Sequence, residues 1–276
     1  MNSPKSQSAE TDIAHTASSI SVSWLLCTHV ANEYLRLAIN SCLEQSFHDF
    51  ELLIIANGSN AEEIAATVFD WYGDDPRLRI FTTEIRHLVF SLNLGLHHAR
   101  GNLIARMDGD DISKPDRLER QVSFMLSHPE VAVLGTSFNI IDEQGNEQCQ
   151  ISQPSTNEAI RKKLFISNPF CHPTIMFRRN IVLDAGGYLG GLHAEDYDLW
   201  TRLALIKSCE FHNLPDTCLG YRIFGIGNAR RSRLAYSSVA ASQFRNFILG
   251  FGLKWLASSF FTVVKAFIRS KPIHER

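Results

Sequence analysis

The sequence predicts an α/β fold built around a mostly parallel sheet, and three observations support this prediction. Apolar runs that favour strands alternate with segments of helical apolar spacing through residues 21–107. The run FELLIIA at 50–56 is apolar almost throughout, which is typical of a strand covered on both faces. A carboxylate cluster at 108–111 directly follows the last of these runs. Open α/β sheets place their ligands beyond the carboxyl ends of strands, so this cluster stands where such a fold would hold a ligand.

The first half of the chain supplies the alternation. Its expected strands lie at 21–28, 50–56, 77–82 and 103–107, and its expected helices at 32–46, 61–72 and 91–99. Each β-α-β unit crosses over in the right-handed sense. The strands should therefore be parallel, and the loops that follow them should meet at one edge of the sheet.

The second half mixes both kinds of element. A helix is expected from near Pro115 to about His128, followed by a strand at 131–141 and a hairpin turn at 142–146. Farther along the chain we expect a strand at 174–177, a turn at 186–188 and a helix at 195–206.

Length and composition set the class of protein. A chain of 276 residues that is 45% hydrophobic suits one large or two small domains with a sizeable core. Residues 1–19 are polar without periodicity and predict a disordered tail. They hold no basic region followed by an apolar run, so we expect no secretory signal. The six cysteines lack C-x-x-C or zinc spacing, which predicts reduced thiols in a cytoplasmic environment.

Charge is distributed unevenly. Ten of the 27 Lys and Arg residues, but one of the 29 Asp and Glu residues, lie from Arg222 onward. This segment therefore carries +9 and the rest of the chain −11, which matches the net charge of −2. A basic end on an acidic body favours contact with anionic lipid. It disfavours nucleic acid, which the body would repel.

The same C-terminal segment, 226–276, should be helical. Residues 247–268 are strongly apolar and aromatic, and Lys254 and Lys265 share one helical face. This pattern predicts a helix lying in a membrane interface with its lysines outward. Two alternatives stay open: a pair of helices packed on the body or on a second subunit, and a helix that spans the bilayer.

The acidic cluster carries the chemistry. Asp108, Asp110 and Asp111 lie within four residues, and carboxylates together with substrate phosphates are the ligands that hard divalent cations prefer. The cluster therefore predicts a metal–diphosphate site, with a solvated acidic turn as the alternative.

An ordered series of segments resembles the family-2 glycosyltransferases of bacterial surface-polysaccharide synthesis, which have the GT-A fold. The resemblance covers about residues 22–222. The segments that carry it are CT at 27–28 with EYL at 33–35, FELLIIANGSN at 50–60, LNLGL at 92–96 with ARG at 99–101, ARMDGDD at 105–111 with PDRLERQ at 115–121, HPEVAVLG at 128–135, HPT at 172–174, GGY at 186–188 and AEDYDLW at 194–200.

The resemblance implies a Rossmann-like sheet flanked by helices, with a nucleotide-sugar half at 20–111 and an acceptor half at 112–225. It implies an inverting, metal-dependent hexosyl-type transferase that uses Mn²⁺ or Mg²⁺. The donor would be a nucleotide diphosphate sugar, with UDP expected as the nucleotide. The acceptor would be a hydroxyl of a glycan or lipid-linked glycan, at the inner face of the cytoplasmic membrane. The oligomeric state stays open.

The family pattern also implies residue roles. Asp110 would bind the metal, Asp108 would bind ribose or assist the metal, and Asp111 would brace their loop. Asp196 would act as general base and Glu195 would orient the site; the alternative is that both acids merely complement a helix dipole. The residues implied to bind the nucleotide sugar are Thr28, Glu33, Asn57, Asn93, Arg106 and Asp108.

Two positions depart from the family pattern. Asn57 replaces a usual aspartate in the nucleotide loop, and Phe224 replaces a common histidine after Tyr221-Arg222. The diphosphate could then pair with Arg222 or with a cluster whose alternative role is to face anionic lipid. That cluster consists of Arg230, Arg231 and Arg233.

Two further side chains have simpler expected roles. His172 is expected to be a structural histidine, with a place near the acceptor as the alternative. Trp200 is expected in the core.

Two rival functions are considered. A catalytically inactive sugar-nucleotide or glycan-binding module would explain the changes at Asn57 and Phe224. A nucleotidyltransferase also uses a parallel sheet and paired carboxylates. It should carry a glycine-rich basic loop after the first strand, and THVA at 28–31 is not one.

Overall fold

The computed structural model describes residues 21–191, 193–225 and 232–269, so the predicted tail 1–19 lies outside the described residues. The strands are β1 (Val22–Thr28), β2 (Phe50–Asn57), β3 (Leu78–Thr83), β4 (Leu103–Asp108), β5 (Ile112–Ser113), β6 (Val131–Ile141), β7 (Glu147–Ile151), β8 (Met176–Arg178) and β9 (Glu210–Arg222). The helices are α1 (Glu33–Leu43), α2 (Ala61–Tyr72), α3 (Leu88–His98), α4 (Arg117–Ser127), α5 (Asn157–Leu164), the 3₁₀ helix η1 (His172–Thr174), α6 (Arg179–Asp184), α7 (Glu195–Leu203), α8 (Arg233–Ile248) and α9 (Leu253–Arg269).

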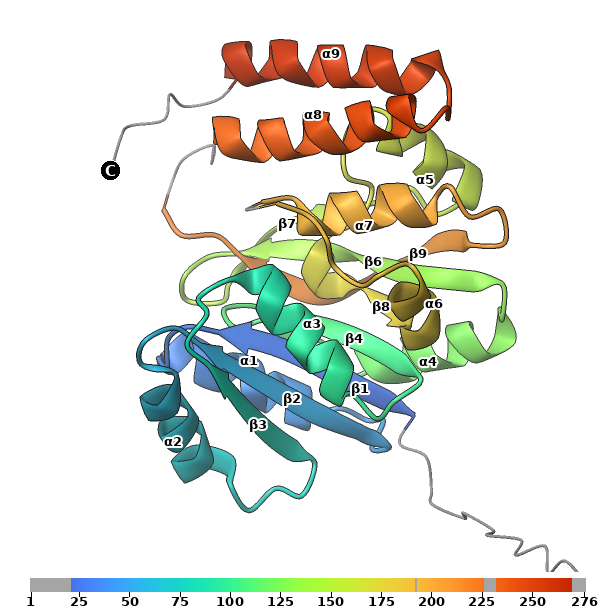
Figure 1. The fold of residues 1–276 in the computed structure, drawn as a ribbon. Coiled ribbons are helices and arrows are strands. Elements are labelled where there is room, and N and C mark those ends of the chain that lie inside the picture. Colours follow the sequence, from blue (N-terminus) through green and yellow to red (C-terminus); the bar gives the residue numbers. More distant parts are fainter. Residues whose placement is uncertain (1–20, 192, 226–231, 270–276) are drawn as a thin grey trace, which may run out of the picture.

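One mixed sheet organises the described residues, with the strand order β3-β2-β1-β4-β8-β6-β9-β5 and β7 added beside β6. The first four strands are parallel, as the alternation predicts. Beyond β4 the sheet changes character, because β8 pairs antiparallel with both β4 and β6, while β6 and β9 are parallel. The α/β fold class is therefore confirmed, with antiparallel pairs confined to the half that follows β4 (Figure 1).

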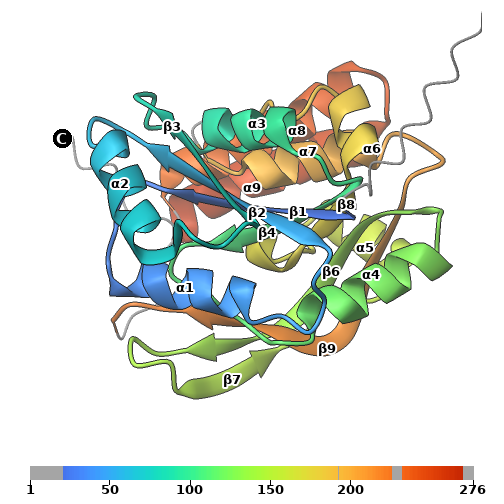
Figure 2. The same cartoon turned by 90° about the horizontal axis from the view of Figure 1, so that it is seen from below.

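Helices cover both faces of the sheet, and each face has its own core. α1, α2 and α4 pack over one face through residues such as Ile39, Val68 and Leu118. α3, α5, α6 and α7 pack over the other through Leu96, Trp200 and their neighbours, and Figure 2 shows the two layers edge on. Trp200 is fully buried, which confirms its predicted place in the core.

Local signals explain most element boundaries. The Asn32 side chain accepts a hydrogen bond from the backbone N–H of Leu35, which caps α1 and satisfies an otherwise unpaired donor. α3 begins at Leu88, three residues before the expected start. The strand expected at 174–177 is displaced toward the C-terminus, because Pro173 lies in η1 and β8 begins only at Met176.

The C-terminal apolar stretch 247–268 is not one helix. It belongs to α8 and α9, which are separated by a turn in which Gly250 and Gly252 have φ values of +86° and +102°. Side chains with a Cβ rarely adopt these angles, so the two glycines break the helix. α8 stacks on α7 and α9 stacks on α8, farthest from the sheet (Figure 1). Over the described ranges, no helix has the length and apolar character that a bilayer crossing needs.

Candidate active site

Three adjoining cavities lead from the edge where the parallel strands end to the C-terminal helices. The first, here called the strand-end cleft, has a volume of about 570 Å³ and includes Thr28, Asn57, Asp108 and Asp110 in its walls. These four residues lie at or just beyond the carboxyl ends of β1, β2 and β4. The structure therefore brings together the side chains that the sequence placed at this edge.

Asp108 and Asp110 of the acidic cluster line the strand-end cleft, and Asp111 is buried behind them. Single carboxylate oxygens of Asp108, Asp110 and Asp111 all lie within 4.8 Å of one another. Burial and the neighbouring Asp108 carboxylate raise the pKa of both Asp110 and Asp111. A divalent cation would relieve this repulsion, and an all-oxygen donor set suits Mg²⁺ or Mn²⁺, so the residues present fit a metal.

Asp111 and Arg222 hold the acidic loop in place. The buried Asp111 carboxylate accepts a hydrogen bond of 2.9 Å from the backbone N–H of Arg222. The Arg222 guanidinium donates in turn to the carbonyl of Asp110 at 2.7 Å and to two carbonyls of the β6–β7 turn. Arg222 therefore serves mainly as a brace, although its buried Nη2 has no partner within the described part of the chain.

Arg106 is a buried cation beside the acidic cluster. It lies on β4 with 4% of its side chain exposed, and its Nη2 forms an ion pair with Asp108. Its Nη1 is buried without a hydrogen-bond partner among the described residues. Arg117, buried below it on α4, donates to the carbonyl of Arg106 at 2.8 Å and so supports this strand end. An orphaned guanidinium N–H is a donor poised for an anionic or hydroxylic ligand.

The second cavity, the middle pocket, has a volume of about 480 Å³ and shares Asp108 and Tyr221 with the strand-end cleft. Arg106 lines it from β4, and Glu195 and Asp196 line it from the N-terminus of α7. Both carboxylates therefore share a pocket with Asp108 of the acidic cluster, although nearly ninety residues separate them from it in the sequence.

Glu195 and His172 form the buried side of the middle pocket. Burial and the adjacent Asp196 carboxylate raise the pKa of Glu195 to about 7. His172 Nδ1 lies 3.6 Å from a Glu195 oxygen, and His172 Nε2 lies 3.0 Å from the Tyr188 hydroxyl. Burial and the charge of Arg106 lower the pKa of His172 well below its usual range. His172 is therefore a neutral, hydrogen-bonded histidine that also lines the pocket.

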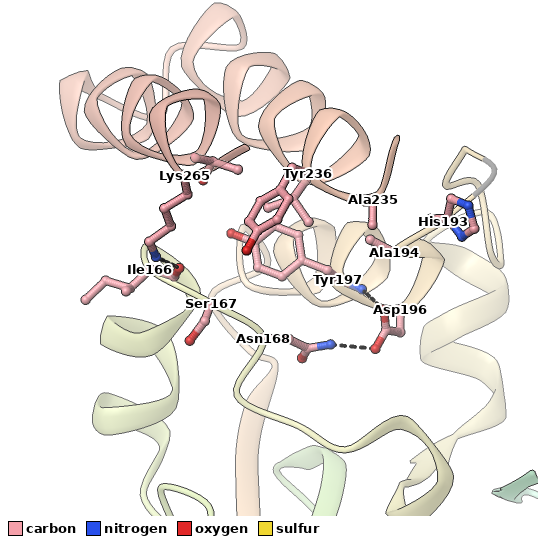
Figure 3. Close-up of a pocket in the computed structure, with 12 residues that line it drawn as sticks. Ile166, Ser167, Asn168, His193, Ala194, Asp196, Tyr197, Ala235, Tyr236 and Lys265 are labelled. Atoms are coloured by element: carbon pink, nitrogen blue, oxygen red, sulfur yellow. Dashed lines mark hydrogen bonds between the residues drawn. The ribbon is translucent and has the colours of Figure 1, made fainter. Parts of the chain in front are cut away.

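Asp196 stands at the border of the third cavity, the helix-side pocket of about 430 Å³ (Figure 3). One of its oxygens accepts from the Asn168 amide, and the other accepts from the backbone N–H of Tyr197 at 2.7 Å. α8 and α9 close the far side of this pocket with Tyr236 and Lys265. Asp196 thus shares one pocket with Asp108 and another with the C-terminal helices.

Two residues predicted to bind the nucleotide sugar are not in these cavity walls. Glu33 is exposed in the first turn of α1. Asn93 uses its amide to hold the turn at Tyr188, donating to the carbonyl and accepting from the N–H at 2.8 and 2.9 Å. Their implied roles receive no support from these positions.

Both residues that depart from the family pattern lie in the strand-end cleft. Asn57 lines the strand-end cleft, as does Phe224, whose ring packs edge-on against Tyr34 with 5.1 Å between centroids. The guanidinium of Arg233 lies over the Phe267 ring on α9. Arg230 and Arg231 lie outside the described residues.

Sequence reasoning missed several residues that line the cavities. Asn168 is the partner of Asp196, and the segment 86–88 closes the strand-end cleft. The segment 86–88 had a usable signal, because it follows β3 at the same edge as the other loops. Asn168 had none, since its distance from Asp196 depends on the tertiary fold alone.

A profile of the family described as "Glycosyl transferase family 2" matches residues 23–187. The chain is 38% identical over 230 residues to the O-antigen biosynthesis glycosyltransferase WbnJ of Escherichia coli, covering 82% of this chain and 89% of that protein. It is 34% identical over 190 residues to the amylovoran biosynthesis glycosyltransferase AmsE of Erwinia amylovora, covering 69% and 71%.

A more distant relative from Escherichia coli is a UDP-Gal:alpha-D-GlcNAc-diphosphoundecaprenol beta-1,3-galactosyltransferase, 25% identical over 205 residues and 74% of each chain.

Solved structures share the fold. S. aureus TarS 1–349 in complex with UDP-GlcNAc superposes with a TM-score of 0.62 at 16% identity, covering 89% of this chain and 81% of that one. The mannosyltransferase PcManGT of Pyrobaculum calidifontis, in complex with GDP-Man and Mn²⁺, gives 0.62 at 15% identity, covering 90% and 73%. Structural similarity at this low identity shows a shared fold, whereas the family profile and the relatives above 30% identity show the family of this chain. The chain belongs to glycosyltransferase family 2.

Proposed function

We propose that the protein is an inverting glycosyltransferase that moves a sugar from a UDP-linked donor to a hydroxyl of a lipid-linked glycan in surface-polysaccharide synthesis. The observation that carries the proposal is the run of adjoining cavities from Asn57 to Lys265, with Asp108 of the acidic cluster and Asp196 both lining the middle pocket. Such a run provides room for a donor at one end and an acceptor at the other.

The strand-end cleft is the proposed donor site. Thr28 and Asn57 would contact the nucleoside, while Asp108 and Asp110 would hold Mn²⁺ or Mg²⁺. When bound, the metal neutralises charge that develops on the diphosphate leaving group. The orphaned Nη1 of Arg106 would donate to the sugar or the diphosphate inside the middle pocket.

The middle pocket is the proposed reaction site. The acceptor oxygen forms a bond to C1 of the sugar while the bond from C1 to the diphosphate oxygen breaks, and the electron pair leaves with the diphosphate. The acceptor proton passes to the Asp196 carboxylate. Attack opposite the leaving group inverts C1. Asn168 would hold Asp196 in position. The raised pKa of Glu195 would keep that neighbour largely neutral below pH 7.

Relatives support the acceptor and the pathway. Two relatives are named for O-antigen and amylovoran synthesis, and a third is named for transfer to a sugar on diphosphoundecaprenol. In this chain, Lys265 lies at the helix-side pocket beyond Asp196, where a cation could meet an acceptor diphosphate. The six cysteines are all free thiols, which supports a reducing cytoplasmic setting.

The proposed division into a donor half at 20–111 and an acceptor half at 112–225 is crossed by the cavities. Tyr221, Arg222 and Phe224, from the second half, line the donor cleft, and Arg106 and Asp108, from the first half, line the middle pocket.

A catalytically inactive sugar-nucleotide or glycan-binding module is the second candidate. Asn57 and Phe224, which line the cleft where the family often has an acid and a histidine, favour it.

Transfer assays test the proposal and separate the two candidates. Wild type, Asp196→Asn and a matched surface control, Asp184→Asn, would be assayed with a panel of UDP-sugars, Mn²⁺ and a diphosphate-lipid glycan acceptor. We expect the Asp196 variant to lose about 10²–10⁴-fold in turnover, and the control to match wild type. Equal turnover in all three would remove Asp196 as the base. UDP binding without turnover on any donor would favour the binding module.

A further inference from the structure

α9 buries its polar side and exposes its apolar side. Its polar stripe, Ser258, Ser259 and Thr262, is buried against α8, with Trp255 on the same side. The opposite side is apolar and exposed. We call this side the outer face of α9, and its residues are Leu253, Leu256, Phe260, Val263, Val264, Phe267 and Ile268. A surface helix in water normally has the reverse arrangement.

Hydrogen bonds fix this orientation. Ser259 donates to the carbonyl of Ala240 at 2.9 Å, and Thr262 donates to the Gln243 side chain at 2.8 Å. Gln243 donates in turn to the Tyr197 hydroxyl on α7. Rotating α9 to bury its apolar face would break these bonds and leave Gln243 buried without its partner. The apolar outer face is therefore a consequence of how the helix is held.

The side chains of the outer face are unusually exposed for large apolar residues. Leu253, Phe260, Phe267 and Ile268 are each 69–74% exposed. Exposed apolar side chains also occur at the end of α8 and in the turn before α9, at Ile248, Leu249 and Phe251. Contiguous apolar surface of this kind marks an interaction site rather than ordinary solvent-facing surface.

Cations border this apolar face, and α8 and α9 contain no acidic residue. The Arg233 guanidinium lies 5.4 Å from the centre of the Phe267 ring, and Lys265 Nζ lies 4.3 Å from that of Phe261. Lys254 is exposed at the other end of α9. Aromatic and aliphatic side chains edged by Lys and Arg match the boundary between acyl chains and anionic headgroups.

We propose that the outer face of α9 docks the protein on an anionic lipid surface. The apolar side chains enter the acyl boundary, and Arg233 and Lys254 meet lipid phosphates. The helix lies in the plane of the interface, with the sheet held away from it by α7 and α8 (Figure 1).

Docking would also orient the acceptor site, a part of the inference that rests on the proposed function. Lys265 belongs both to α9 and to the helix-side pocket, which ends at Asp196 (Figure 3). A lipid-linked acceptor could then stay anchored in the bilayer while its glycan reaches Asp196.

Vesicle co-sedimentation of the full chain tests the docking. The samples are wild type, a variant carrying Phe260→Ser, Phe267→Ser and Ile268→Ser, and the control Leu126→Ser, which changes a residue 74% exposed on α4. We expect wild type and control to pellet with phosphatidylcholine vesicles that contain phosphatidylglycerol, and less with phosphatidylcholine alone. The triple variant should bind about tenfold or more weakly, because binding scales with buried apolar area.

Other outcomes overturn the inference. Equal pelleting of all three proteins would show that the outer face does not bind lipid. Sedimentation velocity without vesicles covers the rival occupant, a second copy: a wild-type dimer that the triple variant loses would assign the face to self-association. A transfer assay with a water-soluble acceptor separates a loss of docking from a loss of catalysis. A triple variant that transfers like wild type but no longer pellets supports docking, whereas wild type that pellets without any transfer contradicts the proposed function alone.

Discussion

Glu195 makes the stability of the protein depend on pH near neutrality. Its pKa rises from 4.5 to about 7 through burial and the neighbouring Asp196 carboxylate, and 12% of its side chain is exposed. A carboxyl group with a raised pKa binds more protons in the folded state than in the unfolded state. The contribution of Glu195 to stability is therefore fully present below its pKa in the unfolded state, and it is lost as pH rises through its pKa in the folded state. A rise in pKa of this size corresponds to about 3 kcal/mol.

Replacing Glu195 by Gln removes this dependence. Urea unfolding of both proteins without donor, from about pH 4.5 to about pH 8, measures it. We expect the variant to gain stability relative to wild type as pH rises, by about 3 kcal/mol across that range. Glu44→Gln, at the exposed C-terminal end of α1, is the matched control and should show a flat difference.

Two results would refute the reasoning. A flat stability difference for Glu195→Gln would mean that this carboxyl group is not held in a buried, acid-crowded setting. A loss of transfer in Glu195→Gln as large as that in Asp196→Asn would assign the proton transfer to the pair, or to Glu195, rather than to Asp196 alone. Measuring both properties on the same preparations separates the electrostatic argument from the catalytic one.

Two further predictions concern the site, and a third concerns the packing of the sheet. Asp110→Asn should lower activity by about 10²-fold or more and raise the Mn²⁺ concentration needed for half activity, and an unchanged Mn²⁺ dependence would remove Asp110 from the metal site. Asn168→Ala should reduce kcat by about tenfold with KM for the donor unchanged, because Asp196 loses a hydrogen bond that orients it. Asn168→Asp, which cannot donate this hydrogen bond when ionised, should not restore kcat. Gly101→Ala should destabilise the fold by about 1–3 kcal/mol in urea unfolding, since a Cβ there would lie 2.5 Å from the backbone nitrogen of Ser23; wild-type stability would show that the strand yields.

Local patterns predict much of the fold. The parallel strands β1 to β4 follow from apolar runs separated by helices with a clear inner face, and their boundaries differ from the expected ones by one residue. The strand beside β4 was harder to place. β8 has three residues, too few to show a period, and it pairs with partners far along the chain. Short strands that depend on remote partners leave little trace in the sequence.

The proposed site was also predictable from the sequence only in part. Its acids at Asp108, Asp110 and Asp196 stand out in the sequence because they follow a strand or begin a helix. The distance between these groups, and the raised pKa of Glu195, arise only when α7 packs beside the end of β4. Desolvation and charge interactions depend on separation in space, and spacing along the chain does not report it.

The C-terminal helices show the contrast most directly. By itself, the sequence determined that this segment is basic, apolar and helical, with lysines on one face. Only the tertiary structure decided which face turns inward. Gln243 and the carbonyl of Ala240 offer hydrogen bonds to the Ser and Thr stripe of α9. Buried polar groups need such partners, so the polar stripe packs inward and the apolar face of α9 is left outside.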